Sequence, residues 1–303
     1  MRIVLAGGTG FLGQALCRHL LEGGHCLTLL TRGAPREQPA DGIELRQWTP
    51  DGTAGDWAAA IDGADAVVNL AGESIASARW TAERRQRIHD SRVLATRSLV
   101  TAMSGASHPP AVLVNASAQG YYGDRGDEEL TEESAPGSDF LAQVCLDWES
   151  AALQATPLAR VVLLRTGIVL SKDEGALARM LVPFRMFGGG PLGSGRQYMS
   201  WIHLRDWVGM ATWAIEDDRV VGPVNIGSPG PVRNAEFART LGKILGRPSW
   251  LPAPSFALKA ALGQMAEALL LGSIRMRPAR AQELGYQFVF PDLAPALRNI
   301  LNS

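Results

Sequence analysis

The sequence has few cysteines, almost no net charge and no long apolar run, and each shortage excludes a class of protein. Cys17, Cys26 and Cys145 are odd in number and widely spaced, so we expect free thiols in a reducing compartment instead of a disulfide framework. A formal net charge of -1 over 303 residues provides no overall basic surface for nucleic acid or membranes. No apolar run approaches the ~20 residues that cross a bilayer. We therefore expect a globular, cytoplasmic protein with neither a nucleic-acid nor a membrane partner.

Metal-ligand and hydrolase motifs are missing too. The five histidines show no metal-ligand spacing and the cysteines do not pair, so the sequence predicts no metal site. There is no Gly-x-Ser-x-Gly motif, which argues against a serine hydrolase of that type. The hydrophobic fraction of 46% is typical of a globular protein with a sizeable core.

The first thirteen residues, MRIVLAGGTGFLG, carry the strongest local pattern. An apolar run, Ile3 to Ala6, predicts a buried strand, and Phe11 to Glu22 predicts an amphipathic helix. Gly7 and Gly10 lie between the two segments, and Gly13 lies in the first turn of the predicted helix. Their Gly-x-x-Gly-x-x-Gly spacing is typical of a dinucleotide-binding turn. A diphosphate needs bare backbone at a helix N-terminus, where free N–H groups and the helix dipole favour an anion. The residues predicted to bind the cofactor here are Gly7, Thr9, Gly10, Phe11, Leu12 and Gly13.

The end of the second predicted strand, Cys26 to Thr31, indicates which dinucleotide binds. An NAD-binding unit usually has an acidic residue there, but this chain has Arg32, 19 residues after Gly13. A carboxylate would repel a 2′-phosphate, whereas a guanidinium can pair with it. We therefore predict NADP(H), with Arg32 on the 2′-phosphate and Thr31 or Arg36 assisting.

Strands and helices alternate through the first half of the chain. Further strands are expected at Ile43–Gln47, Ala66–Leu70, Ala111–Asn115 and Arg160–Arg165, and helices at Thr53–Ile61, Arg79–Met103 and Phe140–Gln154. This pattern predicts an α/β fold with a doubly wound parallel sheet, the Rossmann fold. Residues 1–165 would form the NADP-binding domain. Residues 166–303 would form mainly a smaller, mixed C-terminal lobe for the substrate, with some elements rejoining the sheet.

The second half has a looser rhythm. Strands are expected at Tyr198–Ile202 and Pro223–Ile226, and helices at Arg205–Ile215, Asn234–Leu245, Phe256–Leu271 and Leu293–Leu301. The glycine-rich stretch from Gly188 to Gly195 could act as a mobile lid.

Several segments, in order along the chain, resemble a known family. They are GGTGFLG, VNLAG, SAQGYYG, LRTGIVLS and WIHLRDW. Together they resemble the extended short-chain dehydrogenases/reductases, the nucleotide-sugar epimerase and dehydratase group. AGESIASARWT and the tail from Pro254 to Phe288 look like an atypical subgroup of epimerase-family proteins, which includes member 39U of that superfamily and bacterial YfcH. The resemblance covers essentially the whole chain and implies NADP(H) binding. It also implies that Leu70, Ala71 and Gly72 line the nicotinamide ribose through their backbone.

The chain departs from that family at the catalytic pair. The family uses Tyr-x-x-x-Lys on one helical face, where the ammonium lowers the pKa of the tyrosine for proton exchange. The corresponding helix, Phe140 to Glu149, contains neither Tyr nor Lys. The substitutes predicted for the acid/base role are Ser117, Tyr121 and Glu73, in that order. Cys145 is the one polarisable group on this helix, although free cysteine is more often a small core residue.

Charged segments elsewhere leave alternatives open. Arg79, Arg85 or Arg92 could meet a substrate phosphate or carboxylate, or could simply belong to a solvated helix face. The acidic segment 124–139 is expected to be an exposed loop that pairs with basic neighbours. His203 and Asp206 could orient a substrate, but similar segments in the superfamily more often brace the lobe, so we expect them to brace the C-terminal lobe.

Two functions follow from the sequence. The first is an NADP(H)-dependent oxidoreductase or epimerase that acts on a sugar-like or other hydroxyl/carbonyl substrate. The second is a non-catalytic NADP(H)-binding, redox-sensing module, which the missing Tyr and Lys favour. The two long helices could also form a four-helix interface, so a homodimer is one expected assembly.

Overall fold

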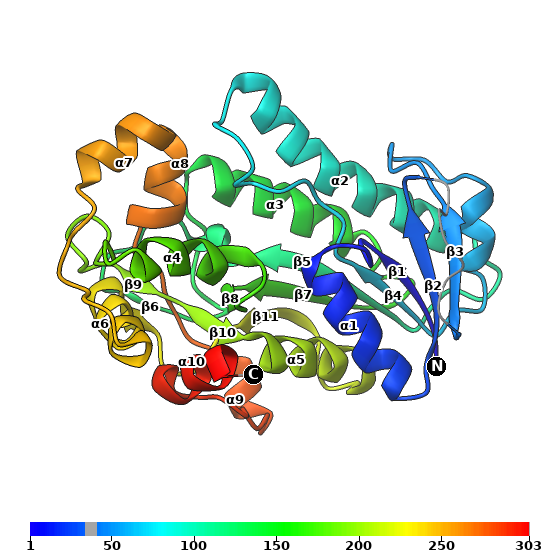
Figure 1. The fold of residues 1–303 in the computed structure, drawn as a ribbon. Coiled ribbons are helices and arrows are strands. Elements are labelled where there is room, and N and C mark those ends of the chain that lie inside the picture. The colour runs from blue at the N-terminus through cyan, green and yellow to red at the C-terminus, as the bar shows by residue number, and fades with distance from the viewer. Residues whose placement is uncertain (34–40, 303) are drawn as a thin grey trace.

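The computed structural model describes residues 1–33 and 41–302, and a seven-stranded parallel sheet organises it (Figure 1). The strand order is β11-β7-β5-β4-β1-β2-β3, and every neighbouring pair is parallel. The strands are β1 (Arg2–Ala6), β2 (Cys26–Thr31), β3 (Ile43–Gln47), β4 (Ala66–Asn69), β5 (Val112–Ala118), β7 (Arg160–Thr166) and β11 (Gly222–Ile226). The predicted Rossmann-type fold is confirmed.

Helices cover both faces of the sheet because its central strands are apolar on both sides. In β1, Ile3 and Leu5 face a core shared with α1 (Phe11–Glu22) and α5 (Leu204–Glu216). Their neighbours Val4 and Ala6 face the opposite core. There they meet α2 (Ala82–Gly105), α3 (Phe140–Leu153) and the short 3-10 helix η1 (Asp56–Ala60). In Figure 1, α2 and α3 lie above the sheet and α1 and α5 lie below it.

The chain order reverses between β1 and β4. After β1 the chain builds outward through β2 and β3, and it then returns to place β4 on the other side of β1. Ligands of open α/β sheets bind outside the carboxyl ends of the strands at such a switch point. The carboxyl ends of β1, β4 and β5 are therefore where a site is expected.

The C-terminal half combines a smaller lobe with elements that rejoin the sheet. β11 pairs with β7, and α5 packs beside α1. The lobe's helices are α4 (Gly175–Arg185), α6 (Asn234–Leu245), α7 (Ser255–Leu262), α8 (Gln264–Ala266), the π-helical turn η3 (Glu267–Leu271), α9 (Ala279–Glu283) and α10 (Leu293–Asn302). Three short pairs complete it: β8 (Ile168–Leu170) with β10 (Trp201–His203), β9 (Tyr198–Met199) with β12 (Val232–Arg233), and β6 (Glu129–Leu130) with β13 (Arg275–Met276). The domain boundary at residue 165 stays a prediction.

Some predicted elements differ in the structure. The expected helix Phe256–Leu271 breaks at Gly263, whose φ of 62° belongs to the left-handed region. The expected helix Thr53–Ile61 shortens to η1. The expected helix Arg79–Met103 begins instead at Ala82, because the Thr81 side chain caps it by accepting from the Arg84 N–H. The loop 188–195 is tied down, with Gly193 N–H donating to Ala253 O and Leu192 N–H donating to Asn234 Oδ1.

Within residues 1–33 and 41–302, no helix combines the length and the apolar character that a membrane span requires. The same residues hold no cluster of His, Cys, Asp or Glu side chains suited to a metal ion.

Candidate functional site

The glycine turn between β1 and α1 is packed tightly against backbone at Gly7 and Gly13 and is open at Gly10. Gly7 has φ 84°, and a Cβ on it would lie 2.7 Å from the Leu70 carbonyl. A Cβ on Gly13 would lie 2.2 Å from Gly7 O. At Gly10, by contrast, a Cβ would meet nothing nearer than Gly7 O at 3.4 Å. Close backbone contacts at Gly7 and Gly13 thus fix the turn, and Gly10 leaves bare backbone exposed.

The N-terminus of α1 is prepared for an anion. Gly10 caps the helix without a side-chain hydrogen bond, and its first turn contains no acidic residue. The N–H groups of Phe11 and Leu12 therefore point out of the helix end with the positive end of its dipole. Gln14 Nε2 donates to Thr9 O over 2.8 Å and holds the loop in place. These residues fit the diphosphate of a dinucleotide.

The segment after β4 lies directly beside this turn. Leu70 N–H donates to Ala6 O over 2.8 Å, and Ala71 N–H donates to Asn69 Oδ1 over 3.1 Å. Asn69 is itself fixed by a buried bond to Asn115 Oδ1 of 2.7 Å. The buried amides thereby set the path of Leu70, Ala71 and Gly72 along the carboxyl edge of the sheet.

Arg32 lies at the end of β2 as an exposed side chain. No ion pair joins it to another residue of the described chain, so its guanidinium is available to a phosphate. Thr31 Oγ1 donates to Gly33 O over 2.9 Å, which shapes the turn that holds Arg32. Arg36, the other predicted contact, lies outside the described residues.

Ser117 belongs to a buried hydrogen-bond network. Its Oγ donates to Glu149 Oε1 over 2.6 Å, and Arg165 donates twice to the Glu149 carboxylate over 2.9 Å. Burial alone would lower the pKa of Arg165, but the hydrogen bonds and charge of Glu149 raise it above its ordinary value. The network links β5, α3 and β7. Within it, the Ser117 hydroxyl uses its one proton in the hydrogen bond to Glu149.

The Arg165 guanidinium also packs against the ring of Tyr121. The Cζ atom of Arg165 is 3.4 Å from the centroid of the Tyr121 ring, and the ring of Tyr122 packs edge-on at 5.2 Å. Tyr122 is fully buried and donates to Asn225 Oδ1, and burial raises its pKa to about 12. Tyr121 is only partly buried, and its hydroxyl makes no hydrogen bond to a described residue. Of the three predicted acid/base residues, Tyr121 has the hydroxyl that remains available.

Glu73 is held by arginines of α2. Its carboxylate pairs with the buried Arg84 and lies 3.7 Å from Arg87 Nε. Arg84 also donates to Ser74 O and Ser77 Oγ. Glu73 therefore anchors the loop after β4, and its charge is already paired.

On α3, Leu141 and Cys145 face the turn that follows β5. Both pack against Gly120, at the four-residue spacing that places side chains on one helical face. Cys145 Sγ donates to Ala118 O over 3.8 Å. Burial raises the pKa of the Cys145 thiol to about 12, so it is neutral at physiological pH.

The arginines of α2 and the loop before it go to different places. The Arg85 guanidinium lies over the Phe140 ring at 5.3 Å. The exposed Arg79 reaches Gly263, between α7 and α8. Arg92 instead lies against Gly72 at the carboxyl edge of the sheet. Of the three, Arg92 is the one placed beside the residues predicted to line the nicotinamide ribose.

The predicted structural residues of the C-terminal lobe are confirmed as such. Asp206 accepts from Val289 N–H over 2.7 Å and from Phe290 N–H over 2.9 Å. His203 stacks on the Phe290 ring at 4.1 Å. The acidic segment 124–139 also pairs with basic neighbours, as expected, through Asp127–Arg233, Glu129–Arg277 and Glu133–Arg280. These pairs join it to the C-terminal lobe.

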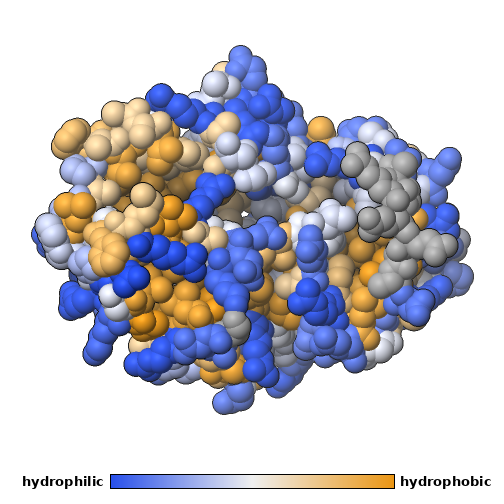
Figure 2. Space-filling view, viewed as in Figure 1, coloured by the Kyte–Doolittle hydropathy of each residue, from blue (hydrophilic) through white to orange (hydrophobic). Residues whose placement is uncertain are grey.

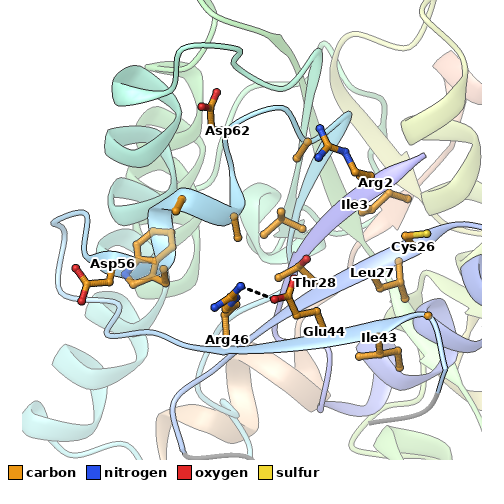
Figure 3. A pocket seen from close by; sticks show the side chains of 16 residues that line it. Arg2, Ile3, Cys26, Leu27, Thr28, Ile43, Glu44, Arg46, Asp56 and Asp62 are labelled. Carbon is orange, nitrogen blue, oxygen red and sulfur yellow. Dashed lines mark ion pairs between the residues drawn. The ribbon is translucent and has the colours of Figure 1, made fainter.

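Figure 2 shows a hollow between the two halves of the molecule, on the face where α1 and α4 are seen. α4 borders it: a Cβ on Gly175, its first residue, would lie 3.5 Å from the ring of Phe11. A separate cavity of about 500 Å³ lies beside β1, β2, β3 and η1 (Figure 3), lined by Arg2, Thr28, Glu44, Arg46 and others. That cavity is at the amino-terminal halves of β1 and β2, away from the glycine turn.

Sequence reasoning missed Glu149 and Arg165. The sequence did contain a signal for Arg165: it directly follows the apolar run VVLL in the strand RVVLLRT, and a charge there needs a buried partner. The partner could not be identified, because Glu149 is on another element and contact between them requires the folded sheet.

Residues 3–227 match the sequence profile of the NAD dependent epimerase/dehydratase family. The chain belongs to this family. Residues 253–300 match a domain of unknown function, DUF1731. The chain is 42% identical, over 99% of its length and 87% of the other, to the Arabidopsis thaliana chloroplastic homologue of epimerase family protein SDR39U1.

Solved structures agree with this family assignment. The human epimerase family protein SDR39U1, isoform 2, whose crystal structure contains NADPH, matches with 36% identity, a TM-score of 0.90 and full coverage of both chains. A Corynebacterium glutamicum nucleoside-diphosphate sugar epimerase matches with 33% identity and a TM-score of 0.79, over 99% of this chain and 58% of that one. The resemblance to the atypical epimerase-family subgroup is confirmed.

Proposed function

We propose that this family member is an NADP(H)-dependent oxidoreductase or epimerase that acts on a hydroxyl or carbonyl substrate in the hollow between its two halves. The observation that carries the proposal is the glycine turn, where Gly10 leaves open backbone at the uncapped N-terminus of α1. The NADPH in the crystal structure of the human relative supports the same cofactor here. A sugar-like substrate is supported by the activity named for the Corynebacterium relative.

Arg32 selects the phosphorylated dinucleotide in this proposal. It is exposed at the end of β2 and has no ion pair to another described residue. A guanidinium binds a phosphate through two parallel hydrogen bonds and gains little from a free ribose hydroxyl. Gly7, Thr9, Gly10, Phe11, Leu12 and Gly13 would hold the diphosphate, and Leu70, Ala71 and Gly72 would line the nicotinamide ribose.

Tyr121 is the residue we assign to proton transfer. When bound, the nicotinamide supplies or accepts the hydride. Tyr121 donates its hydroxyl proton to a carbonyl oxygen during reduction and takes it back in the reverse direction. The Arg165 guanidinium under its ring stabilises the phenolate that forms, and Glu149 keeps that guanidinium in place. Ser117 and Glu73 act structurally, since each is already committed to another residue.

The test is a turnover assay of the wild-type protein and Tyr121→Phe. Oxidation of NADPH is followed by its absorbance with panels of carbonyl compounds and nucleotide sugars, and epimer formation is followed by chromatography. The proposal expects turnover with at least one compound. It is abandoned if no compound is converted although NADPH binds.

A second function, a non-catalytic NADP(H)-binding module, is favoured by one observation. The helix that the family resemblance expects to carry Tyr and Lys has neither, and its face towards Gly120 presents Leu141 and the neutral thiol of Cys145. This alternative predicts NADPH binding without turnover, and a protein partner that binds the NADPH-bound and the NADP⁺-bound forms with different affinity.

A homodimer through α2 and α3 would have to bury polar side chains, because Gln86, Arg87 and Gln143 are exposed there. Size-exclusion chromatography with light scattering tests that assembly.

A further inference from the structure

Arg92 places a cation at the carboxyl edge of the sheet. It lies on α2, and its Nη1 donates to Ile88 O, one turn earlier, over 2.9 Å. An ideal Cβ on Gly72 would lie 3.2 Å from Arg92 Cζ. Glycine at position 72 therefore gives the guanidinium room to lie directly against the backbone after β4.

Among the described residues, no carboxylate forms an ion pair with Arg92. Glu73 acts on it electrostatically, but its carboxylate is already paired with Arg84 and Arg87. Burial lowers the pKa of Arg92, with Cys145 and Glu73 acting against that change, but an arginine stays protonated in proteins. Cys145 is a neutral thiol, because burial raises its pKa to about 12. The Arg92 guanidinium also lies over the Trp148 ring, 5.3 Å from its centroid, and the face of that ring favours a cation.

The Arg92 guanidinium also keeps donors free. Its five N–H groups make one hydrogen bond to a described residue, the bond to Ile88 O. The side chain is only partly buried. The site therefore has a fixed positive charge beside Gly72, and the segment Leu70–Gly72 is the one predicted to line the nicotinamide ribose.

We infer that Arg92 biases the cofactor site towards the reduced cofactor, so that the protein binds NADPH more tightly than NADP⁺. The inference rests on the proposed cofactor site. The nicotinamide ring is cationic in NADP⁺ and neutral in NADPH, so a fixed cation nearby disfavours the oxidised form. Both forms carry the same phosphates, which therefore cancel in the ratio of the two affinities. This charge makes the bound cofactor a stronger oxidant than the free one.

The test compares the dissociation constants of NADPH and NADP⁺ by calorimetric titration. The proteins are the wild type, Arg92→Met, Arg92→Lys and the control Arg97→Met, which removes an exposed charge from the same helix. We expect the wild type to prefer NADPH, and Arg92→Met to reduce that preference about tenfold, which corresponds to about 30 mV for a two-electron couple. Arg92→Lys keeps the charge and most of the preference, and Arg97→Met leaves it unchanged.

Two results would overturn the inference. One is equal affinity of the wild type for the two forms, which needs no variant to fold. The other is an unchanged ratio in Arg92→Met while both forms still bind. If the wild type binds neither form, it is the proposed cofactor site that fails, and the two failures are thereby distinguished.

Discussion

Ser117 Oγ donates to Glu149 Oε1 over 2.6 Å, inside a network that both residues share with Arg165. The bond joins the end of β5 to α3, the helix in which the family resemblance leads one to expect Tyr and Lys. Ser117 comes from the strand end and Tyr121 from the turn that follows. The Ser117 hydroxyl is held in a hydrogen bond to Glu149, whereas the Tyr121 hydroxyl makes none to a described residue.

Substitution of the two hydroxyls separates their roles. We expect Tyr121→Phe to lower kcat about 10²- to 10⁴-fold, the usual contribution of a general acid or base, with NADPH affinity unchanged. Ser117→Ala should keep most of the turnover but lower the melting temperature, because Glu149 loses a buried donor. Steady-state kinetics and thermal denaturation measure both effects. Loss of turnover in Ser117→Ala with full activity in Tyr121→Phe would reverse the assignment.

The pair between Arg165 and Glu149 should contribute strongly to stability, because the two side chains are 4% and 7% exposed. Removing one partner of a buried ion pair leaves the other charge uncompensated and typically costs about 3–5 kcal/mol. Urea denaturation of Arg165→Met should show a loss of that order. Arg277→Met removes a half-exposed partner of Glu129 and should cost less than about 1 kcal/mol. Similar losses for both variants would contradict this account of the network.

Two glycines of the same turn should respond differently to alanine. Gly13→Ala places a Cβ 2.2 Å from Gly7 O, so we expect a stability loss of about 1–3 kcal/mol from forced rearrangement. Gly10→Ala has room for its Cβ and should fold, with about 1 kcal/mol or less lost at the helix cap. Its methyl group should nevertheless weaken NADPH binding, because it fills the space above the turn. Melting curves and NADPH titrations check the pair, and unimpaired NADPH binding by Gly10→Ala would refute the diphosphate site.

The three cysteines should differ in reactivity towards iodoacetamide at pH 8. Cys26 is exposed, whereas Cys17 and Cys145 are buried and burial raises their pKa values to about 11 and about 12. The thiolate is the reactive form, so both buried thiols stay protonated until the pH approaches those values. Mass spectrometry of the native protein should find Cys26 alkylated first. Equally fast labelling of Cys145 would show that the helix face beside Gly120 is open.

The first half of the fold could be predicted because its signals are local. Its first unit is contiguous in sequence: an apolar run, Ile3–Ala6, then the glycines, then the amphipathic helix Phe11–Glu22. Each of these features supports the assignment of the next. The sequence analysis did not predict helix α4, although Leu177, Leu181 and Phe184 have helical spacing.

The candidate site was predicted only where one segment makes it. The glycine turn and Arg32 lie within the first β-α-β unit, so spacing alone was enough to predict them as cofactor-binding residues. The partners of Ser117 and Glu73 come from α3 and α2, and their pairing follows from the packing of those helices on the sheet. The sequence ranked Ser117 first among the catalytic candidates because nothing in it shows that the Ser117 hydroxyl donates to Glu149.

Titration of NADPH and NADH into the wild-type protein and Arg32→Gln tests the central claim most directly, with Arg18→Gln, an exposed arginine of α1, as the matched control. We expect the wild type to bind NADPH more tightly than NADH, and Arg32→Gln to lose about 10- to 100-fold in NADPH affinity, the size of one charge-assisted hydrogen bond, with NADH affinity unchanged. Equal affinities of the wild type for NADPH and NADH, or no binding of either, would contradict the account.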